Sequence, residues 1–273
     1  MAKQLLFGTA GIPISCNGNV LDAMQTLNEL ELNAMELEFV RGVNMKKELA
    51  QKLKIVAEKN NIALTVHAPY YINLNTLDKR KFLASKKRII DSAVMGGIAG
   101  AKSVAIHAAY FMKMDEKIVL QKLVSAFNEI LQDLKNCKIF LSPETGGKLS
   151  QFGSLEQHLE LAQEVNGLKF CIDFAHLHAR GNGCLKEKKD FDHLLQEIEK
   201  VDKNFLKEMH IHCSGINYSP KGEKNHLILK ESDFNYKALM ESLKEFDVSG
   251  ILICESPNLE EDSLLMKKYY DSL

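Results

Sequence analysis

Short apolar runs alternate with longer amphipathic segments along the whole chain. The runs are rich in β-branched and other apolar residues, which is typical of buried strands. They cover residues 5–7, 34–39, 62–67, 103–107, 138–144, 168–173, 208–212 and 250–255. The longer segments carry apolar residues with a period near 3.6, which predicts helices that each bury one face. These helices cover residues 20–30, 46–59, 79–95, 116–134, 155–165, 191–201, 236–245 and 259–270.

This alternation of strand and helix predicts a parallel sheet of the α/β class. Eight strand–helix units favour a closed (β/α)₈ barrel, a single TIM barrel, over an open doubly wound sheet. The glycine-rich stretch 93–101 precedes a strand and lacks the spacing of a phosphate-binding loop, so we interpret it as a tight turn between a helix and a strand. No Pro/Gly/Ser-rich linker divides the chain, and we expect one domain over residues 1–273.

Composition excludes several classes of protein. The 273 residues carry 35 basic and 36 acidic side chains, and 45% of them are hydrophobic, which argues against a disordered chain or a uniformly basic nucleic-acid coat. No run of 18 apolar residues could cross a membrane, and the N-terminus has no signal-peptide pattern. The six cysteines are scattered, so we expect reduced thiols in a cytoplasmic protein.

Ligand-type side chains follow six of the predicted strands, 29 to 45 residues apart. They are His67, His107, Glu144, Asp173, His210 and Glu255. A lone histidine or carboxylate is usually structural, but parallel barrel strands end on one face, so six in phase favour a functional site there. Packed carboxylates repel unless cations lie between them, and mixed imidazole and carboxylate ligands suit zinc, manganese or iron. Glu144, in the middle of the set, would bridge two metal ions.

Two further histidines extend this predicted metal site. His176 lies three residues after Asp173, and His226 lies in the loop after the seventh strand. We interpret His212 as lying farther out than His210 on the same strand, and we leave it out of the ligand set. His158 and His193 lie in helical segments and are predicted to be structural.

In combination, the motifs around these residues resemble those of the endonuclease IV family, in the same order along the chain. They are His67-Ala-Pro-Tyr-Tyr-Ile-Asn-Leu74, Ile106-His107, Ser142-Pro-Glu144-Thr-Gly-Gly, Cys171-Ile-Asp173-Phe-Ala-His176, Met209-His210, the loop His226 and Ile253-Cys-Glu255-Ser-Pro. The resemblance implies a TIM barrel with three zinc ions that cuts DNA on the 5′ side of abasic sites. The products would be a 3′-hydroxyl and a 5′-deoxyribose phosphate.

The resemblance also assigns the ligands. His67, His107 and Glu144 would hold one zinc ion, and His176 and His226 a third. The second ion would be held by Glu144, Asp173, His210 and Glu255. The family has an aspartate two residues before the loop histidine, where this chain has Lys224; the adjacent Glu223 would replace it if the loop were shifted by one residue. Two or three zinc ions are therefore expected, with manganese as the alternative.

The expected partner is double-stranded DNA that contains an abasic site. Tyr70 and Tyr71 match the family's position for side chains inserted into the base stack, and Arg41 is the expected basic contact. Lys148, Arg180, Lys221 and Lys224 lie in other loops where they could meet phosphates. We expect no membrane contact and a monomer. Glu144 would be catalytic, because it would also orient the attacking water.

Two other classes of function compete with the nuclease. A sugar isomerase or epimerase of the xylose isomerase-like type would hold a single divalent metal with Glu144, Asp173, His210 and Glu255. It would not need His107 and His226, which favours the nuclease. A binding module that kept only the fold would be expected to have lost ligands, whereas eight ligand-type residues are present.

Overall fold

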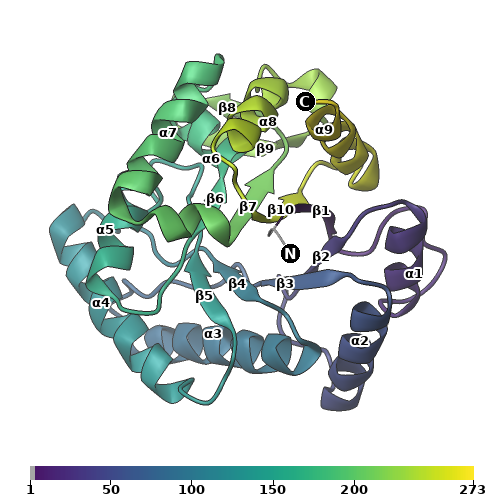
Figure 1. Cartoon of the computed structure of the whole chain (residues 1–273). Coiled ribbons are helices and arrows are strands. Elements are labelled where there is room, and N and C mark those ends of the chain that lie inside the picture. The colour runs from purple at the N-terminus through teal and green to yellow at the C-terminus, as the bar shows by residue number, and fades with distance from the viewer. Residues whose placement is uncertain (1–3) are drawn as a thin grey trace.

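The computed structural model describes residues 4–273, and in it eight parallel strands surround a central axis (Figure 1). The strands are β1 (Leu5–Ala10), β2 (Ala34–Glu38), β3 (Ala63–His67), β4 (Ser103–Ile106), β5 (Phe140–Pro143), β6 (Cys171–Asp173), β7 (Met209–Cys213) and β10 (Gly250–Cys254). Their order in the sheet is β5-β4-β3-β2-β1-β10-β7-β6. A parallel bridge between Glu144 and Cys171 joins the two remaining edges, so the strands form a TIM barrel, as the alternating pattern predicted.

Helices ring the outside of this barrel (Figure 1). The described helices are α1 (Asp22–Glu29), α2 (Lys47–Lys59), α3 (Lys79–Ala99), α4 (Glu116–Asp133), α5 (Leu155–Glu164), α6 (Phe174–Arg180), α7 (Lys188–Val201), α8 (Tyr236–Glu245) and α9 (Glu260–Ser272), with 3₁₀ turns at Lys203–Lys207 and Leu229–Glu231. The short α6 lies at the carboxyl ends of the strands and is not part of the outer ring. Local signals start several of them: Asp78 and Asp115 accept bonds from backbone amides, and Ser154 forms a capping box with Gln157.

One turn prediction was wrong in its position. The stretch 93–101 is mostly helical, because α3 continues through both glycines to Ala99. The helix ends at Gly100, whose φ of 81° lies in the left-handed region that favours glycine.

The periodicity also missed two short features beside the carboxyl ends of the strands. Helix α6 follows β6 without a loop, and a hairpin of β8 (Gly215–Ser219) and β9 (Gly222–Leu227) follows β7. Both are too short for a clear hydrophobic period, and both carry residues of the candidate site.

The apolar core lies between the barrel and its helices, while the inside of the barrel is partly polar. Interior positions include Ala34, Ile251 and Ile253, but also the buried carboxylate of Glu36 and the buried His210. The described cysteines are free thiols, with Cys171, Cys213 and Cys254 buried. Among the described residues, no helix is long and apolar enough to cross a membrane.

Candidate metal centre

The carboxyl ends of the strands hold a cup of imidazole and carboxylate groups. Glu144, directly after β5, lies at its centre. Its Oε2 is 3.2 Å from Nε2 of His67, the last residue of β3, and 3.5 Å from Nε2 of His107, which follows β4. The Nδ1 of His67 lies 2.7 Å from the Ala68 carbonyl oxygen; a bond donated there turns Nε2 toward the cup. These three side chains form a first donor set, as the motifs predicted.

A second donor set uses the other oxygen of Glu144. The ligand atoms of Glu144, Asp173, His176 and Glu255 lie within 4.8 Å of one another. His212 joins them, with its Nδ1 3.2 Å from Oε1 of Glu144 and 3.3 Å from Oε1 of Glu255. Glu144 is therefore shared by two donor sets, which is the arrangement of a bridging carboxylate.

The structure brings His212, and not His210, to the second donor set. The register pairs Asp173 with His212, whereas His210 pairs with Cys171 one layer deeper in the barrel. The imidazole of His210 instead lies between Ser103 Oγ, at 3.0 Å, and Glu36 Oε2, at 2.9 Å. The predicted ligand His210 therefore lies below the second donor set, because residues that share a strand face differ in depth.

His176, Glu223 and His226 form a third donor set. The Nε2 of His176 is 3.7 Å from Oε2 of Glu223. Strand β9 makes this set because Lys224 bulges out of the ladder: Tyr218 pairs with Glu223, but Asn217 pairs with Asn225. The bulge returns Glu223 to the face of His226, whereas an exposed Lys224 takes the position where the family has aspartate.

Charge in the cup favours cations. Burial opposes ionisation of Glu144, but the imidazoles of His107 and His212 outweigh it and hold its pKa well below the usual range. Burial likewise opposes charging of His67, yet the carboxylate of Glu144, whose Oε2 lies 3.2 Å from Nε2 of His67, raises the pKa of His67 to about 10. Burial raises the pKa of Glu255 to about 7. Glu144 Oε2 and Asp173 Oδ2 are buried without a hydrogen-bond partner among the described residues. The carboxylates and imidazoles of the cup are therefore suitable oxygen and nitrogen ligands for divalent metal ions.

Glu36 lies beneath the cup and was not identified from the sequence. It is fully buried on β2, accepts a hydrogen bond of 2.8 Å from Thr65, and has its oxygens 2.9 Å from Nε2 of both His210 and His212. Burial disfavours its charge, but the two imidazoles hold its pKa well below the usual range. The alternation of apolar and acidic residues in 34–38 was the available signal, because it turns both glutamates to the barrel interior.

We expect Glu36→Gln to weaken zinc binding by ~10–100-fold, because the carboxylate that orients the ring of His212 is lost. Competition with a zinc-binding dye measures this affinity. The exposed Glu58→Gln on α2 is the control and should bind zinc as the wild type does. Unchanged affinity in Glu36→Gln would show that this carboxylate does not support the cup.

The predicted DNA-contacting residues lie beside the cup. Tyr70 and Tyr71 are 57% and 72% exposed, and the ring of Tyr70 packs edge-on against that of His67 with centroids 5.4 Å apart. Arg41, in the segment after β2, is exposed. Arg180, predicted as a possible phosphate contact, donates hydrogen bonds from its guanidinium to the backbone carbonyls of Gly146, Lys148 and Gln151. It therefore stabilises the loop after β5.

The remaining histidines lie outside the donor sets. His193 is an exposed side chain on α7, while His178 is buried against Asp233 at 3.1 Å. His158 is buried on α5, where its Nδ1 lies 2.8 Å from the Ser154 carbonyl oxygen. Burial lowers the pKa of His158 to about 4.

A pH dependence of stability follows for His158. A histidine whose pKa is lowered by folding contributes full stability above pH 6.5 and loses it as pH falls toward 4. Between pH 7 and pH 5 the wild type should therefore lose about 2 kcal/mol more unfolding free energy than His158→Leu. Urea unfolding at both pH values measures this difference. Equal losses in the two proteins would contradict the buried neutral imidazole.

Comparisons with known proteins support the fold and the resemblance. A family model described as xylose isomerase-like TIM barrel matches residues 24–269. An uncharacterized protein of Methanocaldococcus jannaschii is 43% identical, over 99% of this chain and 98% of that protein. A protein of Bacillus licheniformis named probable endonuclease 4 is 26% identical, over 95% of this chain and 91% of that protein. These matches confirm the resemblance drawn from the motifs.

Two solved structures illustrate the likeness in fold. A D-tagatose 3-epimerase-like protein superposes with a TM-score of 0.74 at 18% identity, over 97% of this chain and 96% of that chain. Endonuclease IV from Thermus thermophilus superposes with a TM-score of 0.69 at 15% identity, over 97% of this chain and all of that chain (100%). At such identities the likeness concerns the fold alone.

Proposed function

The chain belongs to the xylose isomerase-like TIM barrel family, and from its donor sets we propose that it is a zinc-dependent endodeoxyribonuclease of the endonuclease IV type. Its substrate would be double-stranded DNA with an abasic site, cut on the 5′ side of that site. The products would be a 3′-hydroxyl and a 5′-deoxyribose phosphate.

The observation that carries this proposal is the joining of three donor sets: the first and second share Glu144, and the second and third share His176. A proton-transferring sugar enzyme with one metal ion would use a single set. Here His67 and His107 supply a set of their own, and His176, Glu223 and His226 supply another. Three adjoining cation sites match the charge of a phosphodiester, which gains negative charge on several oxygens as it is cleaved.

The donor sets would hold the metal ions, and individual side chains would position the attacking water and the imidazoles. Zinc ions bound there would act as Lewis acids toward the phosphate oxygens and lower the pKa of a water molecule. Glu144 holds its two oxygens toward different donor sets and would accept a hydrogen bond from the attacking water. The bonds of His67 to Ala68 and of His226 to Ser214, the latter 2.6 Å, would keep these imidazoles oriented while substrate binds.

Aromatic side chains at the rim fit the geometry of a damaged duplex. Tyr70 and Tyr71 expose large rings beside His67, where they could insert into the base stack next to a missing base. An abasic nucleotide has no base to unpair, so turning it toward the cup would require less free energy than turning a paired nucleotide. Arg41 would contact a backbone phosphate.

The direct test is cleavage of a duplex oligonucleotide that carries one tetrahydrofuran abasic analogue. Purified protein should nick it on the 5′ side, lose the activity with a chelator and regain it with zinc. An intact duplex of the same sequence is the control. Failure of the zinc-loaded protein to cut the abasic duplex would overturn the proposed function.

The metal content tests the third donor set. Elemental analysis should find three zinc ions per wild-type chain and two in Glu223→Ala, because the carboxylate of the third set is lost. Lys224→Ala, at the bulged position beside it, should retain three. A single zinc ion in the wild type would contradict the multinuclear site.

A sugar epimerase is the second candidate, because Glu144, Asp173, His212 and Glu255 alone could hold one divalent ion for proton transfer. Incubation of the same preparation with a panel of ketohexoses separates the candidates. Epimerisation without nicking would favour this second function.

A further inference from the structure

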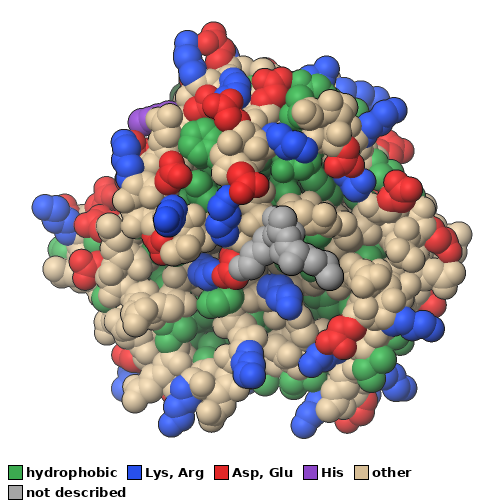
Figure 2. Space-filling view, in the orientation of Figure 1, with side chains coloured by type: hydrophobic (Ala, Val, Ile, Leu, Met, Phe, Trp, Pro, Cys, Tyr) green, Lys and Arg blue, Asp and Glu red, His purple; other side chains and the backbone are tan. Residues whose placement is uncertain are grey.

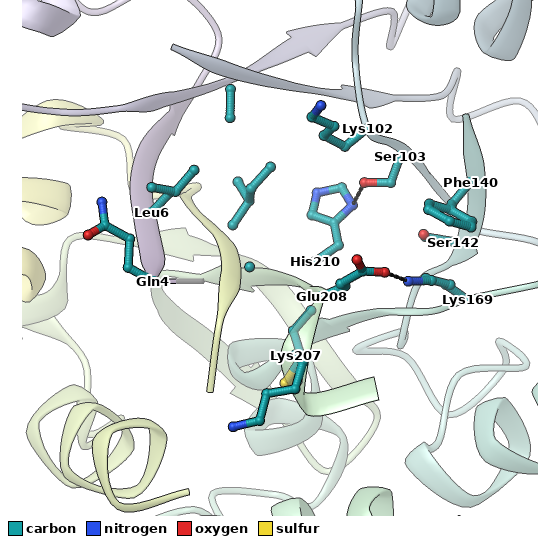
Figure 3. A pocket seen from close by; sticks show the side chains of 14 residues that line it. Gln4, Leu6, Lys102, Ser103, Phe140, Ser142, Lys169, Lys207, Glu208 and His210 are labelled. Atoms are coloured by element: carbon teal, nitrogen blue, oxygen red, sulfur yellow. Dashed lines mark hydrogen bonds and ion pairs between the residues drawn. The ribbon is translucent and has the colours of Figure 1, made fainter. Parts of the chain in front are cut away.

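A cavity of about 400 Å³ opens at the amino-terminal ends of the strands. It lies at the opposite end of the barrel from the metal cup, and Figure 3 shows the side chains that line it. Its walls are largely apolar and include Leu6, Phe140, Met209 and Ile251. The volume lies within the range of small-molecule sites. No step of the proposed nuclease uses this cavity.

The cavity exists because small side chains line the lower layer of the barrel. Ala63, Ser103, Ser142 and Gly250 line it, whereas TIM barrels usually fill their interior with bulky branched residues. Above it, Glu36, His210 and His212 contact one another across the barrel. These buried groups separate the cavity from the metal cup, so the two ends of the barrel offer distinct sites.

The opening of the cavity carries positive charge. Lys102, Lys169 and Lys207 lie around it, and Figure 2 shows several basic side chains near the centre of this face. Lys169 pairs with Glu208, and Lys207 points away from the cavity (Figure 3). The ammonium group of Lys207 pairs with Asp247. Lys102 is exposed and has no ion-pair partner within the part of the chain that the structure describes. It is therefore the cation available to an anionic ligand.

The inner part of the cavity offers a hydrogen-bonding group. Ser142 is 1% exposed, and its Oγ has no hydrogen-bond partner in residues 4–273. An unpaired buried hydroxyl is unfavourable, and a ligand with a polar group at this depth would supply the missing hydrogen bond. Ser103, the other serine of the lining, is already bonded to His210. Ser142 thus selects for a second polar group, well inside the apolar walls.

We propose that this cavity binds a small aromatic carboxylate that carries a hydroxyl group at the far end of its ring. The carboxylate lies at the opening beside Lys102, the ring lies between Leu6, Phe140 and Ile251, and the hydroxyl bonds to Ser142 Oγ. The reverse orientation would place the ligand's carboxylate deep in the barrel, away from Lys102 and toward the carboxylate of Glu36, where desolvation and the like charge would oppose it.

Calorimetric titration with 3-(4-hydroxyphenyl)propanoate tests the proposal. The hydroxy acid should bind saturably, while 3-phenylpropanoate, which lacks the hydroxyl, should bind about fivefold more weakly. The uncharged amide of the hydroxy acid should also bind more weakly, since it loses the charge attraction of Lys102. Absence of saturable binding by the hydroxy acid would overturn the proposal.

Variants test whether Ser142 causes the preference for the hydroxyl group and Lys102 the preference for the carboxylate. Ser142→Ala should bind the two acids with equal affinity, and Lys102→Gln should bind acid and amide equally. Ala63→Leu should fill the cavity and abolish binding in a protein whose circular dichroism and melting remain those of a folded barrel. Lys189→Gln, an exposed charge on α7, should bind as the wild type does. Equal losses in Lys102→Gln and Lys189→Gln, or unchanged hydroxyl preference in Ser142→Ala, would contradict the proposed contacts.

Discussion

Glu144→Gln is expected to lower cleavage of the abasic duplex by at least ~10³-fold while DNA affinity changes by less than ~10-fold. The side chain is buried at the junction of two donor sets, with oxygens 3.2 Å from both His67 and His212. The amide keeps the shape but loses the charge that would bridge two cations. Tyr70, Tyr71 and Arg41 at the rim are unchanged, so binding should persist. Single-turnover nicking and fluorescence anisotropy measure the two quantities.

Glu129→Gln provides the matched control for this substitution. It makes the same chemical change at an exposed carboxylate on α4 that pairs with Lys86. The control should cleave within twofold or so of wild type, since surface ion pairs contribute little to stability. Cleavage by Glu144→Gln at the control's rate would remove this carboxylate from the mechanism.

The second large effect is expected from substitution of His212, and substitution of His210, two positions earlier on the same strand, is the comparison. His212→Asn should lose one zinc ion and ~10³-fold in cleavage, since its Nδ1 lies beside both Glu144 and Glu255. His210→Asn should keep the zinc content and lose less than ~100-fold, because His210 contacts Glu36 and Ser103 below the cup.

Elemental analysis and the nicking assay on the same preparations give both comparisons. Circular dichroism establishes that each variant folds. If His210→Asn lost the zinc ion and His212→Asn retained it, the ligand assignment from sequence motifs would hold and the assignment from geometry would fail.

The barrel itself could be predicted from the sequence, because strand and helix leave different hydrophobic periods. Eight apolar runs separated by amphipathic segments correspond to β1–β7 and β10 with their helices. The position of the cup followed too, since parallel strands carry the residues at their carboxyl ends to one face. His67, His107, Glu144, Asp173, His176 and Glu255 meet there, although they are spread over most of the chain.

Depth within the barrel could not be predicted in this way. His210 and His212 share a face of β7, and only the register against β6 places His212 beside Asp173. The register of a barrel depends on the stagger between neighbouring strands, and this stagger cannot be read from the sequence of one strand. The position of Glu223 could not be predicted either, because it depends on the bulge at Lys224. The bulge places Glu223 and His226, three positions apart, on the same face of β9.

The sequence by itself therefore determined the architecture and the face on which metal ligands gather, because hydrophobic period and strand direction are local properties. The tertiary structure decided which donors share a site, since that depends on register, a bulge and the height of each side chain. It also decided that small residues beneath Glu36 leave a cavity, because a void arises only from how several strands pack together.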